Sequence, residues 1–85
     1  MAEKEIIFYG TTWCGATRRA KRILEEHQIA FLWIDIDQDM DARKRVEEIN
    51  RGHRSVPTII FPDGSILVEP SDAELKEKIG VGNRS

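Results

Sequence analysis

Two kinds of apolar pattern alternate along this chain, and their order restricts the fold more than any other feature. Residues 6–9 and 31–36 are short apolar stretches rich in β-branched and aromatic side chains, which is typical of buried strands. Each stretch is followed by a charged segment in which apolar residues recur at helical spacing, at positions 16, 20, 23 and 24 and at positions 42, 46 and 49. We therefore expect the first strand–helix–strand unit to be parallel with a right-handed crossover.

The second half of the chain predicts a hairpin and a last helix. Residues 58–61 and 65–68 are short apolar runs that flank Pro62-Asp63-Gly64, and an Asp-Gly pair between such runs is a strong hairpin signal. Ser71 and Glu74 have the spacing of a capping box, so a helix should begin after Ser71. The predicted fold class is α/β, in the order βαβαββα, with a four-stranded mixed sheet flanked by three helices.

The length of 85 residues suits a single domain, with a core over about residues 6–79 and a tail over residues 80–85. The 13 basic and 15 acidic residues give a net charge of -2, which weakens the case for a nucleic-acid binder. No apolar stretch approaches the length of a membrane span, and the first five residues lack the apolar region of a secretory signal. We expect no binding to nucleic acid or membranes, and we expect a monomer. Because a single cysteine excludes an internal disulfide framework, the reducing cytoplasm is the expected compartment.

The single cysteine, Cys14, lies between the first strand and the first helical stripe. A sulfur at a helix N-terminus faces unpaired backbone N–H groups and the positive end of the helix dipole, and both favour the thiolate. Arg18 and Arg19 should add positive charge about one turn further on, Gly15 leaves room beside the sulfur, and the Thr17 hydroxyl could donate to it. These features favour a reactive thiolate over the alternative of a small buried hydrophobic residue.

The remaining polar residues predict no metal site. The two histidines and Cys14 do not have the spacing of metal ligands. Aspartates alternate at positions 35, 37, 39 and 41, but no glycine or closing glutamate follows at the spacing of a calcium loop, so we interpret them as a strand end and a helix cap. Of the two tryptophans, we expect Trp33 to pack on the sheet and Trp13 to line a groove beside the thiol.

Four segments of the chain occur together in one known family. Residues 9–21 read Tyr-Gly-Thr-Thr-Trp-Cys-Gly-Ala-Thr-Arg-Arg-Ala-Lys, residues 55–58 read Ser-Val-Pro-Thr, and residues 61–65 and 70–72 read Phe-Pro-Asp-Gly-Ser and Pro-Ser-Asp. In this order and spacing they resemble the active-site segment, the Thr-Val-Pro segment, and the hairpin and last helix start of glutaredoxins, especially the mycoredoxin-like branch. The resemblance covers about residues 6–79 and implies a thioredoxin-like fold.

The resemblance also implies a monothiol thiol–disulfide oxidoreductase. Cys14 would attack a mixed disulfide between a protein and a low-molecular-weight thiol, while Thr17 stabilises the thiolate. Val56 and Pro57, joined by a cis peptide bond, would dock the substrate as an added strand. The other expected substrate-binding residues are Trp13, Gly15, Ser71 and Asp72. Mycothiol or glutathione would be the co-substrate, a recycling reductase would act indirectly, and no cofactor would be tightly bound.

The chain departs from the usual family pattern at three places. Thr17 replaces the second cysteine of Cys-x-x-Cys, so a second small thiol must release the first. Glu69-Pro70 stands where many members have a Gly-Gly pair that holds glutathione, which favours mycothiol or another bacterial thiol. Gly15-Ala16-Thr17 differs from the Gly-Phe-Ser of the iron–sulfur branch, which argues against the alternative of a thiol-bridged dimer carrying a [2Fe–2S] cluster. A non-catalytic thioredoxin-fold adaptor is the second alternative.

Overall fold

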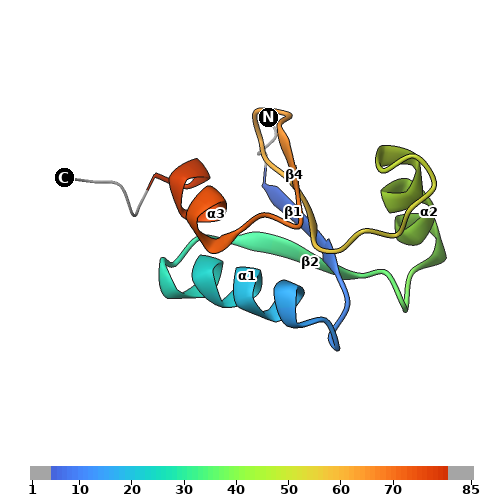
Figure 1. Ribbon diagram of the computed structural model, residues 1–85, viewed down its shortest axis with the longest axis horizontal. Helices are drawn as coiled ribbons and strands as arrows, with labels where there is room; N and C mark the ends of the chain where they lie inside the picture. The colour runs from blue at the N-terminus through green and yellow to red at the C-terminus, as the bar shows by residue number, and fades with distance from the viewer. Residues whose placement is uncertain (1–4, 81–85) are drawn as a thin grey trace.

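The computed structural model describes residues 5–80, and these residues form four strands and three helices in the predicted order (Figure 1). The elements are β1 (Ile6–Gly10), α1 (Gly15–Glu26), β2 (Phe31–Asp35), α2 (Met40–Ile49), β3 (Thr58–Ile60), β4 (Ile66–Val68) and α3 (Asp72–Lys78). The predicted α/β class and βαβαββα order are therefore confirmed. The opening residues 1–4, and the expected tail from residue 81 onward, lie outside the described residues.

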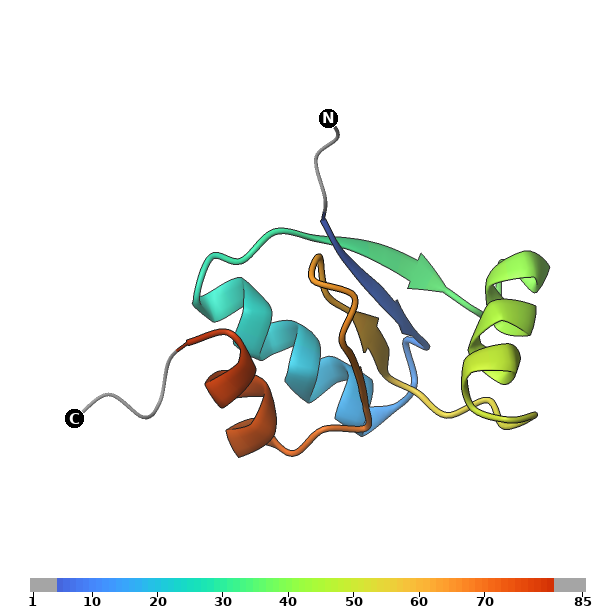
Figure 2. The ribbon, with the colours of Figure 1, turned by 90° about the horizontal axis from the view of Figure 1, so that it is seen from above.

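The four strands form one mixed sheet in the order β2-β1-β3-β4. Strand β1 is parallel to β2 and antiparallel to β3, and β3 is antiparallel to β4. Helices α1 and α3 cover one face of the sheet, and α2 lies on the other face (Figure 2). Because β1 is central and covered on both faces, its sequence is a continuous apolar run rather than an alternating one.

The larger core cluster lies between the sheet and the pair of helices α1 and α3. Phe8 of β1 and Ile59 of β3 are paired in register and fully buried. Leu24 of α1 and Leu75 of α3 pack into the same cluster and have almost no exposed surface. Trp33 packs on the sheet as expected, with its ring centroid 5.6 Å from that of Phe8. This cluster holds α1, and thus the residue that precedes it, against β1.

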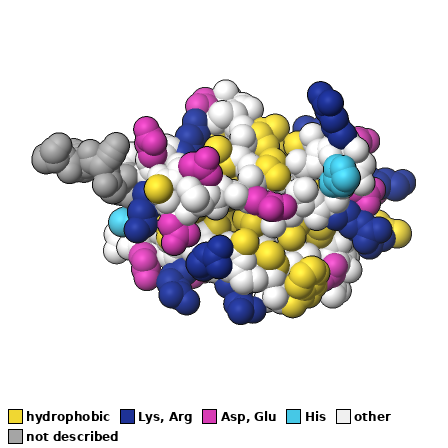
Figure 3. Space-filling model, in the orientation of Figure 1, with side chains coloured by type: hydrophobic (Ala, Val, Ile, Leu, Met, Phe, Trp, Pro, Cys, Tyr) yellow, Lys and Arg dark blue, Asp and Glu magenta, His cyan; other side chains and the backbone are white. Residues whose placement is uncertain are grey.

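The smaller core cluster lies under α2 and contains Tyr9, Ile36, Ala42 and Val46. Helix α2 begins after Asp39, whose carboxylate accepts a hydrogen bond from the Ala42 N–H at 3.0 Å, so the predicted helix cap is confirmed. The sheet face extends beyond α2, and Leu32 and Ile66 at its two edges are exposed. In the view of Figure 3, apolar side chains gather across the middle of the molecule.

The predicted hairpin joins β3 and β4 through a turn at Gly64, which has a φ of 91°. The Gly64 N–H donates to the Phe61 carbonyl at 2.9 Å, and the Phe61 N–H donates to the Ser65 carbonyl at 2.8 Å. Because Phe61 and Ser65 close the turn, each strand is one residue shorter than the sequence predicts.

No helix within residues 5–80 is long and apolar enough to cross a membrane.

Candidate active site

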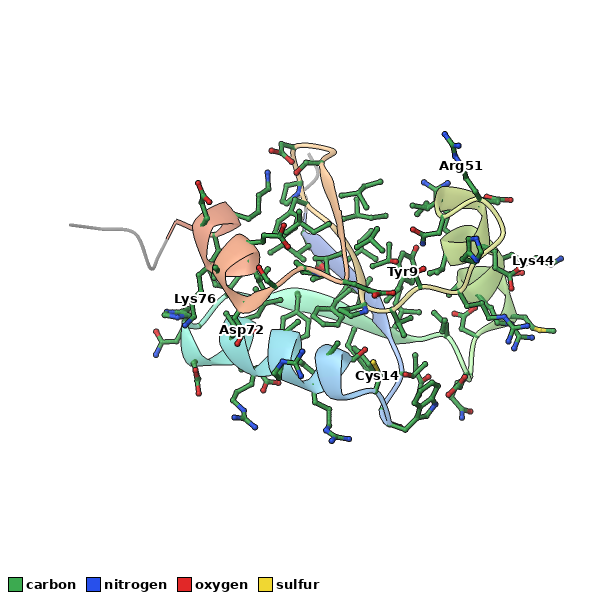
Figure 4. All side chains as sticks on the ribbon, in the orientation of Figure 1. Tyr9, Cys14, Lys44, Arg51, Asp72 and Lys76 are labelled. Carbon is green, nitrogen blue, oxygen red and sulfur yellow. The ribbon has the colours of Figure 1, made fainter. Side chains whose placement is uncertain are left out.

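Cys14 is the N-cap residue of α1 and follows the turn after β1 (Figure 4). Its backbone is extended, and its carbonyl accepts the first hydrogen bond of the helix from the Arg18 N–H at 3.1 Å. The side chain is half-buried, and the thiol points to the Val56 carbonyl oxygen, which lies 4.0 Å from the sulfur. The sulfur therefore sits where the helix start meets the segment that leads into β3.

The pKa of the Cys14 thiol lies below its ordinary value, although its surroundings act in both directions. Burial is the largest single influence and raises the pKa, because a thiolate is poorly solvated there. The backbone N–H of Thr17, the Thr17 hydroxyl and the backbone N–H of Ala16 stabilise the thiolate, and together they outweigh burial. The carboxylate of Glu69 opposes them and raises the pKa of the thiol. The helix start thus favours a nucleophilic sulfur.

The side chain of Thr17 lies on the buried face of α1, between the helix and β1. The residue is 1% exposed, and its Oγ1 has no hydrogen-bond partner within the described part of the chain. A methyl group on Gly10 would lie 2.6 Å from Thr17 Cγ2 and 3.1 Å from Thr17 Oγ1, so glycine is what lets the helix start approach β1. The hydroxyl is near enough to lower the pKa of Cys14 but forms no bond of ordinary geometry with the thiol. It is therefore available to a thiolate.

The segment on the other side of the sulfur is held by its own hydrogen bonds. The Val56–Pro57 peptide bond is cis, as the resemblance implies. Pro57 is buried and Val56 is half-buried. The Thr58 hydroxyl is fully buried and donates to the Ser55 carbonyl at 2.7 Å, and the Asn50 side chain donates to the same hydroxyl at 3.2 Å. The start of β3 and the end of α2 thus fix the backbone that faces Cys14.

Trp13 and the two arginines make contacts around the sulfur. Trp13 is 68% exposed, and its Nε1 donates to Asp37 Oδ2 at 2.8 Å, so the indole is held across the loop between β2 and α2. Arg18 Nη1 donates to the Thr12 carbonyl at 3.4 Å. Arg19 Nε lies 3.7 Å from Asp72 Oδ1 and joins the first turn of α1 to the start of α3. Both arginines therefore hold neighbouring segments, and neither is among the groups that shift the pKa of the Cys14 thiol.

The predicted capping box at the start of α3 is confirmed. The Ser71 hydroxyl accepts from the Glu74 N–H at 3.1 Å, and the Ser71 N–H donates to Glu74 Oε1 at 2.8 Å. The Ser71 N–H is thus used inside the helix start, whereas the hydroxyl only accepts there and its O–H donates to no group within residues 5–80. Asp72 is exposed and lies against Arg19. Gly15, the first residue of α1, is also exposed, and only Arg19 Nη1, at 3.9 Å, lies within 4 Å of where its side chain would begin.

Two residues at the site, Gly10 and Asp37, were not assigned to it from the sequence, and Glu69 was noted only because Glu69-Pro70 replaces a Gly-Gly pair. Gly10 permits the close approach of Thr17, and its position four residues before the cysteine is the only signal that could have found it. Asp37 holds Trp13 through a side-chain contact that leaves no periodic pattern. Glu69 influences the thiol from the connection between β4 and α3. Within residues 5–80, no group of three or more His, Cys, Asp and Glu side chains could hold a metal ion.

Comparisons with known proteins agree with this site. The profile of the Glutaredoxin family matches residues 6–66. The "Putative glutaredoxin Rv3198A" of Mycobacterium tuberculosis is 39% identical over 79 residues, which cover 93% of this chain and 94% of the relative. Mycoredoxin 1 of Corynebacterium glutamicum is 35% identical over 74 residues, which cover 87% of this chain and 91% of the relative.

Solved structures show the same architecture. A mutant of the thioredoxin-like protein BC3987 superposes with a TM-score of 0.78 at 22% identity, over 89% of this chain and all of that one, which speaks for the fold. The glutaredoxin grx-1 of Archaeoglobus fulgidus superposes with a TM-score of 0.74 at 25% identity, over 93% of this chain and 89% of that one. The fold is thus thioredoxin-like, and the chain belongs to the glutaredoxin family, in its mycoredoxin-like branch.

Proposed function

We propose that the protein reduces mixed disulfides between proteins and a low-molecular-weight thiol, with Cys14 as the only nucleophile. The observation that carries this proposal is the position of the thiol at the start of α1, where the Thr17 and Ala16 N–H groups lower its pKa. Family membership supports thiol–disulfide chemistry in general. The monothiol route follows because the chain contains one cysteine.

The reaction has two exchange steps. In the first, the Cys14 thiolate attacks the sulfur of the small thiol in the mixed disulfide; a bond forms between these two sulfurs, and the protein thiolate leaves and takes up a proton. In the second, the thiolate of another small thiol attacks the adduct and releases the Cys14 thiolate, and a disulfide of two small thiols is formed. In sum, the mixed disulfide and one free small thiol become a protein thiol and a disulfide of two small thiols, so one protein sulfur is reduced, one small thiol is oxidised, and no other oxidant or reductant takes part.

The residues around the sulfur have separate parts in this proposal. The Thr17 hydroxyl and the helix N–H groups stabilise Cys14 as attacking and as leaving thiolate. The Val56 backbone beside the cis Pro57 pairs with the substrate, which lies along the start of β3. The remaining substrate-facing residues are Trp13, Gly15, Ser71 and Asp72. All of them come from one chain, so a monomer suffices. The co-substrate is mycothiol or glutathione, with a reductase of the resulting disulfide as an indirect partner.

Intact-mass analysis tests the proposal. Incubation with a peptide in mixed disulfide with a small thiol should release the free peptide and leave one small-thiol adduct on the protein. Steady-state reduction should show ping-pong kinetics. Cys14→Ser should abolish both the adduct and the turnover. Turnover that survives in this variant, or an adduct formed with the peptide in place of the small thiol, would contradict the proposed mechanism.

A further inference from the structure

We propose that Asp37 is a positioning residue, which holds the indole of Trp13 as a fixed apolar surface beside Cys14, and that the protein part of a mixed disulfide docks against this surface. The inference rests on the proposed function, because it concerns the substrate that the Cys14 thiolate attacks. Three observations carry it: the contact between the two side chains, the exposure of the indole, and the place of both loops in the fold.

Trp13 and Asp37 lie in two loops at the same end of the sheet. Strands β1 and β2 are parallel neighbours, so the loops that follow them leave the sheet at the same edge. A backbone hydrogen bond from the Ile36 N–H to the Gly10 carbonyl, at 3.0 Å, joins the two loops. Trp13 directly precedes Cys14 in the first of them. An indole that is held by the second loop is therefore held next to the nucleophile.

The carboxylate of Asp37 has a defined position. The Asp37 N–H donates to Asp35 Oδ1 at 2.9 Å, and the Gln38 N–H donates to the Asp35 carbonyl at 3.0 Å, so a local turn fixes the residue. Its Oδ2 accepts from Trp13 Nε1 at 2.8 Å, a short distance that is typical of a hydrogen bond to a charged acceptor. No ion pair within residues 5–80 includes Asp37, so the indole is the side-chain partner of this carboxylate.

The stability of the fold does not account for this contact. A hydrogen bond in water contributes little to the free energy of unfolding, because water replaces the lost partner, and the backbone bond at Ile36 already joins the two loops. Trp13 nevertheless stays 68% exposed. Since Nε1 is the only polar atom of its side chain and Asp37 occupies it, the surface left to a partner is apolar. Exposed tryptophans of this kind are typical of the energetic centres of protein interfaces.

The two parts of a mixed disulfide meet different surfaces on this site. Helices α2 and α3 lie on opposite faces of the sheet, and α1 starts between them (Figure 2). Charged groups suited to a polar small thiol, Arg19 and Asp72, lie where α1 meets α3 (Figure 4). The indole is held instead by the loop that leads to α2. The apolar surface on this side therefore suits the protein part of the substrate.

A fixed indole should bind this part better than a mobile one. A side chain that is ordered before binding loses less conformational entropy when a partner docks, which for one large side chain changes the affinity by about fivefold. The hydrogen bond from Trp13 to Asp37 supplies this order, so its loss should weaken docking of the peptide without changing the thiol.

The two half-reactions separate this role from a general effect on the site. The substrate is a peptide with one cysteine in mixed disulfide with 2-mercaptoethanol, and free 2-mercaptoethanol releases the adduct. Asp37→Ala should lower kcat/KM for the peptide disulfide about fivefold, chiefly through KM. It should change kcat/KM for 2-mercaptoethanol, and the rate of Cys14 alkylation by iodoacetamide, by less than about twofold.

Two matched variants control this measurement. Asp37→Asn keeps an acceptor oxygen for the indole N–H and should restore most of the lost kcat/KM. Asp41→Ala removes an equal charge from the exposed first turn of α2 and should change none of the three constants. A loss in Asp41→Ala as large as that in Asp37→Ala would mean that charge, and not the hydrogen bond, is responsible, and would overturn the proposal.

A double-variant cycle tests whether Asp37 acts through the indole. Trp13→Phe should lower kcat/KM for the peptide disulfide, and in that background Asp37→Ala should have no further effect. NMR relaxation of the Trp13 indole N–H, whose signal is assigned by its loss in Trp13→Phe, measures the order of the side chain directly. Its order parameter should be close to the value of rigid backbone, about 0.85, in the wild type and should fall in Asp37→Ala.

The outcomes for Asp37 and for the proposed function are distinct. Additive effects of the two substitutions, equal losses in both half-reactions, no loss for the peptide disulfide, or an indole that stays ordered in Asp37→Ala would overturn the role of Asp37. A wild type that releases no peptide would refute the proposed function. In Cys14→Ser, which cannot turn over, the peptide disulfide should still shift the indole N–H resonance of Trp13, and the absence of a shift would overturn docking on this surface.

Discussion

At the scale of single residues, the groups that lower the pKa of the Cys14 thiol lie within its own helical turn. Burial alone would raise the pKa of the thiol, and a half-buried cysteine without donors would be inert at neutral pH. The backbone N–H and the hydroxyl of Thr17 both stabilise the thiolate and so lower the pKa of the thiol. The hydroxyl is buried and has no partner among residues 5–80, an arrangement that is costly unless a thiolate uses it.

Replacing Thr17 by valine should therefore separate reactivity from stability. Loss of one hydrogen bond to the thiolate should raise the pKa of Cys14, because the charged form loses a donor, and should slow alkylation about fivefold at a pH below that pKa. The midpoint of the rate against pH should lie below the usual value of about 8.5 in the wild type and move to higher pH in Thr17→Val. Stability should hardly change, because valine removes an unpartnered buried hydroxyl.

Thr17→Ser is the matched control for this measurement. Serine keeps the hydroxyl and removes only the methyl group, so the rate profile should stay close to that of the wild type. A profile that shifts equally in both variants would mean that the packing of Thr17, and not its hydroxyl, controls the thiol.

Single-residue roles could be predicted from the sequence only where they follow from the position along a helix. The place of Cys14 before the stripe of α1 indicated its helix-start location, and the stripe itself was confirmed at Ala20, Ile23 and Leu24. The contacts of Trp13 with Asp37, and of Glu69 with Pro57, join residues far apart in the chain. Such contacts depend on how loops cross in space, and no periodic pattern records them.

At the scale of elements, the approach of α1 to β1 decides where the thiol lies. Strand β1 ends at Gly10, and the missing side chain there admits Thr17 and the edge of Trp33. The strand bounds expected from the apolar runs agree with the structure to within one residue, and β2 and β3 end one residue early because turns at Asp35 and Phe61 form local hydrogen bonds. The close approach of Thr17 to Gly10 could not be predicted from the sequence, because a glycine at the end of a strand usually indicates only a turn.

Gly10→Ala should disturb this approach. The new methyl group would lie 2.6 Å from Thr17 Cγ2 and 3.0 Å from Trp33 Cζ3, so the helix start must shift. We expect a loss of about 1–3 kcal/mol in the free energy of unfolding, typical of overpacking, and slower alkylation of Cys14. Gly15→Ala is the control, since only Arg19 Nη1 lies within 4 Å of the added methyl group, at 3.9 Å. Urea unfolding of both variants checks the prediction, and equal stability would contradict it.

The first turn of α1 also predicts the behaviour of Thr17→Cys. Residues three apart at a helix start are neighbours, so the new thiol should form a disulfide with Cys14 on mild oxidation. Intact mass should then fall by two hydrogens, and the variant should gain reduction of protein disulfides. Its small-thiol adduct should be shorter-lived, because the second thiol can displace it. Two free thiols after oxidation would mean that Cys14 and residue 17 do not share this turn.

At the scale of the whole molecule, the two core clusters are joined through β1. Phe8 faces the cluster under α1 and α3, and Tyr9 faces the cluster under α2. Neighbouring residues of one strand thus bind the helices on opposite faces of the sheet (Figure 2). This arrangement should make the described residues unfold as one cooperative unit. Such cooperative unfolding is what we expect of the single domain predicted from the chain length.

Val46→Ala tests this cooperativity from the side of the molecule that lacks the thiol. Val46 is fully buried under α2, and its truncation should cost about 2 kcal/mol, which for a domain of this size lowers Tm by about 8–16 °C. If the sheet couples both faces, far-UV circular dichroism, which reports all three helices, and the fluorescence of Trp33, which lies in the other cluster, should shift together. Trp13→Phe, present in both proteins compared, removes the exposed tryptophan from the signal. A circular dichroism transition at lower temperature than the fluorescence transition would show that α2 melts by itself.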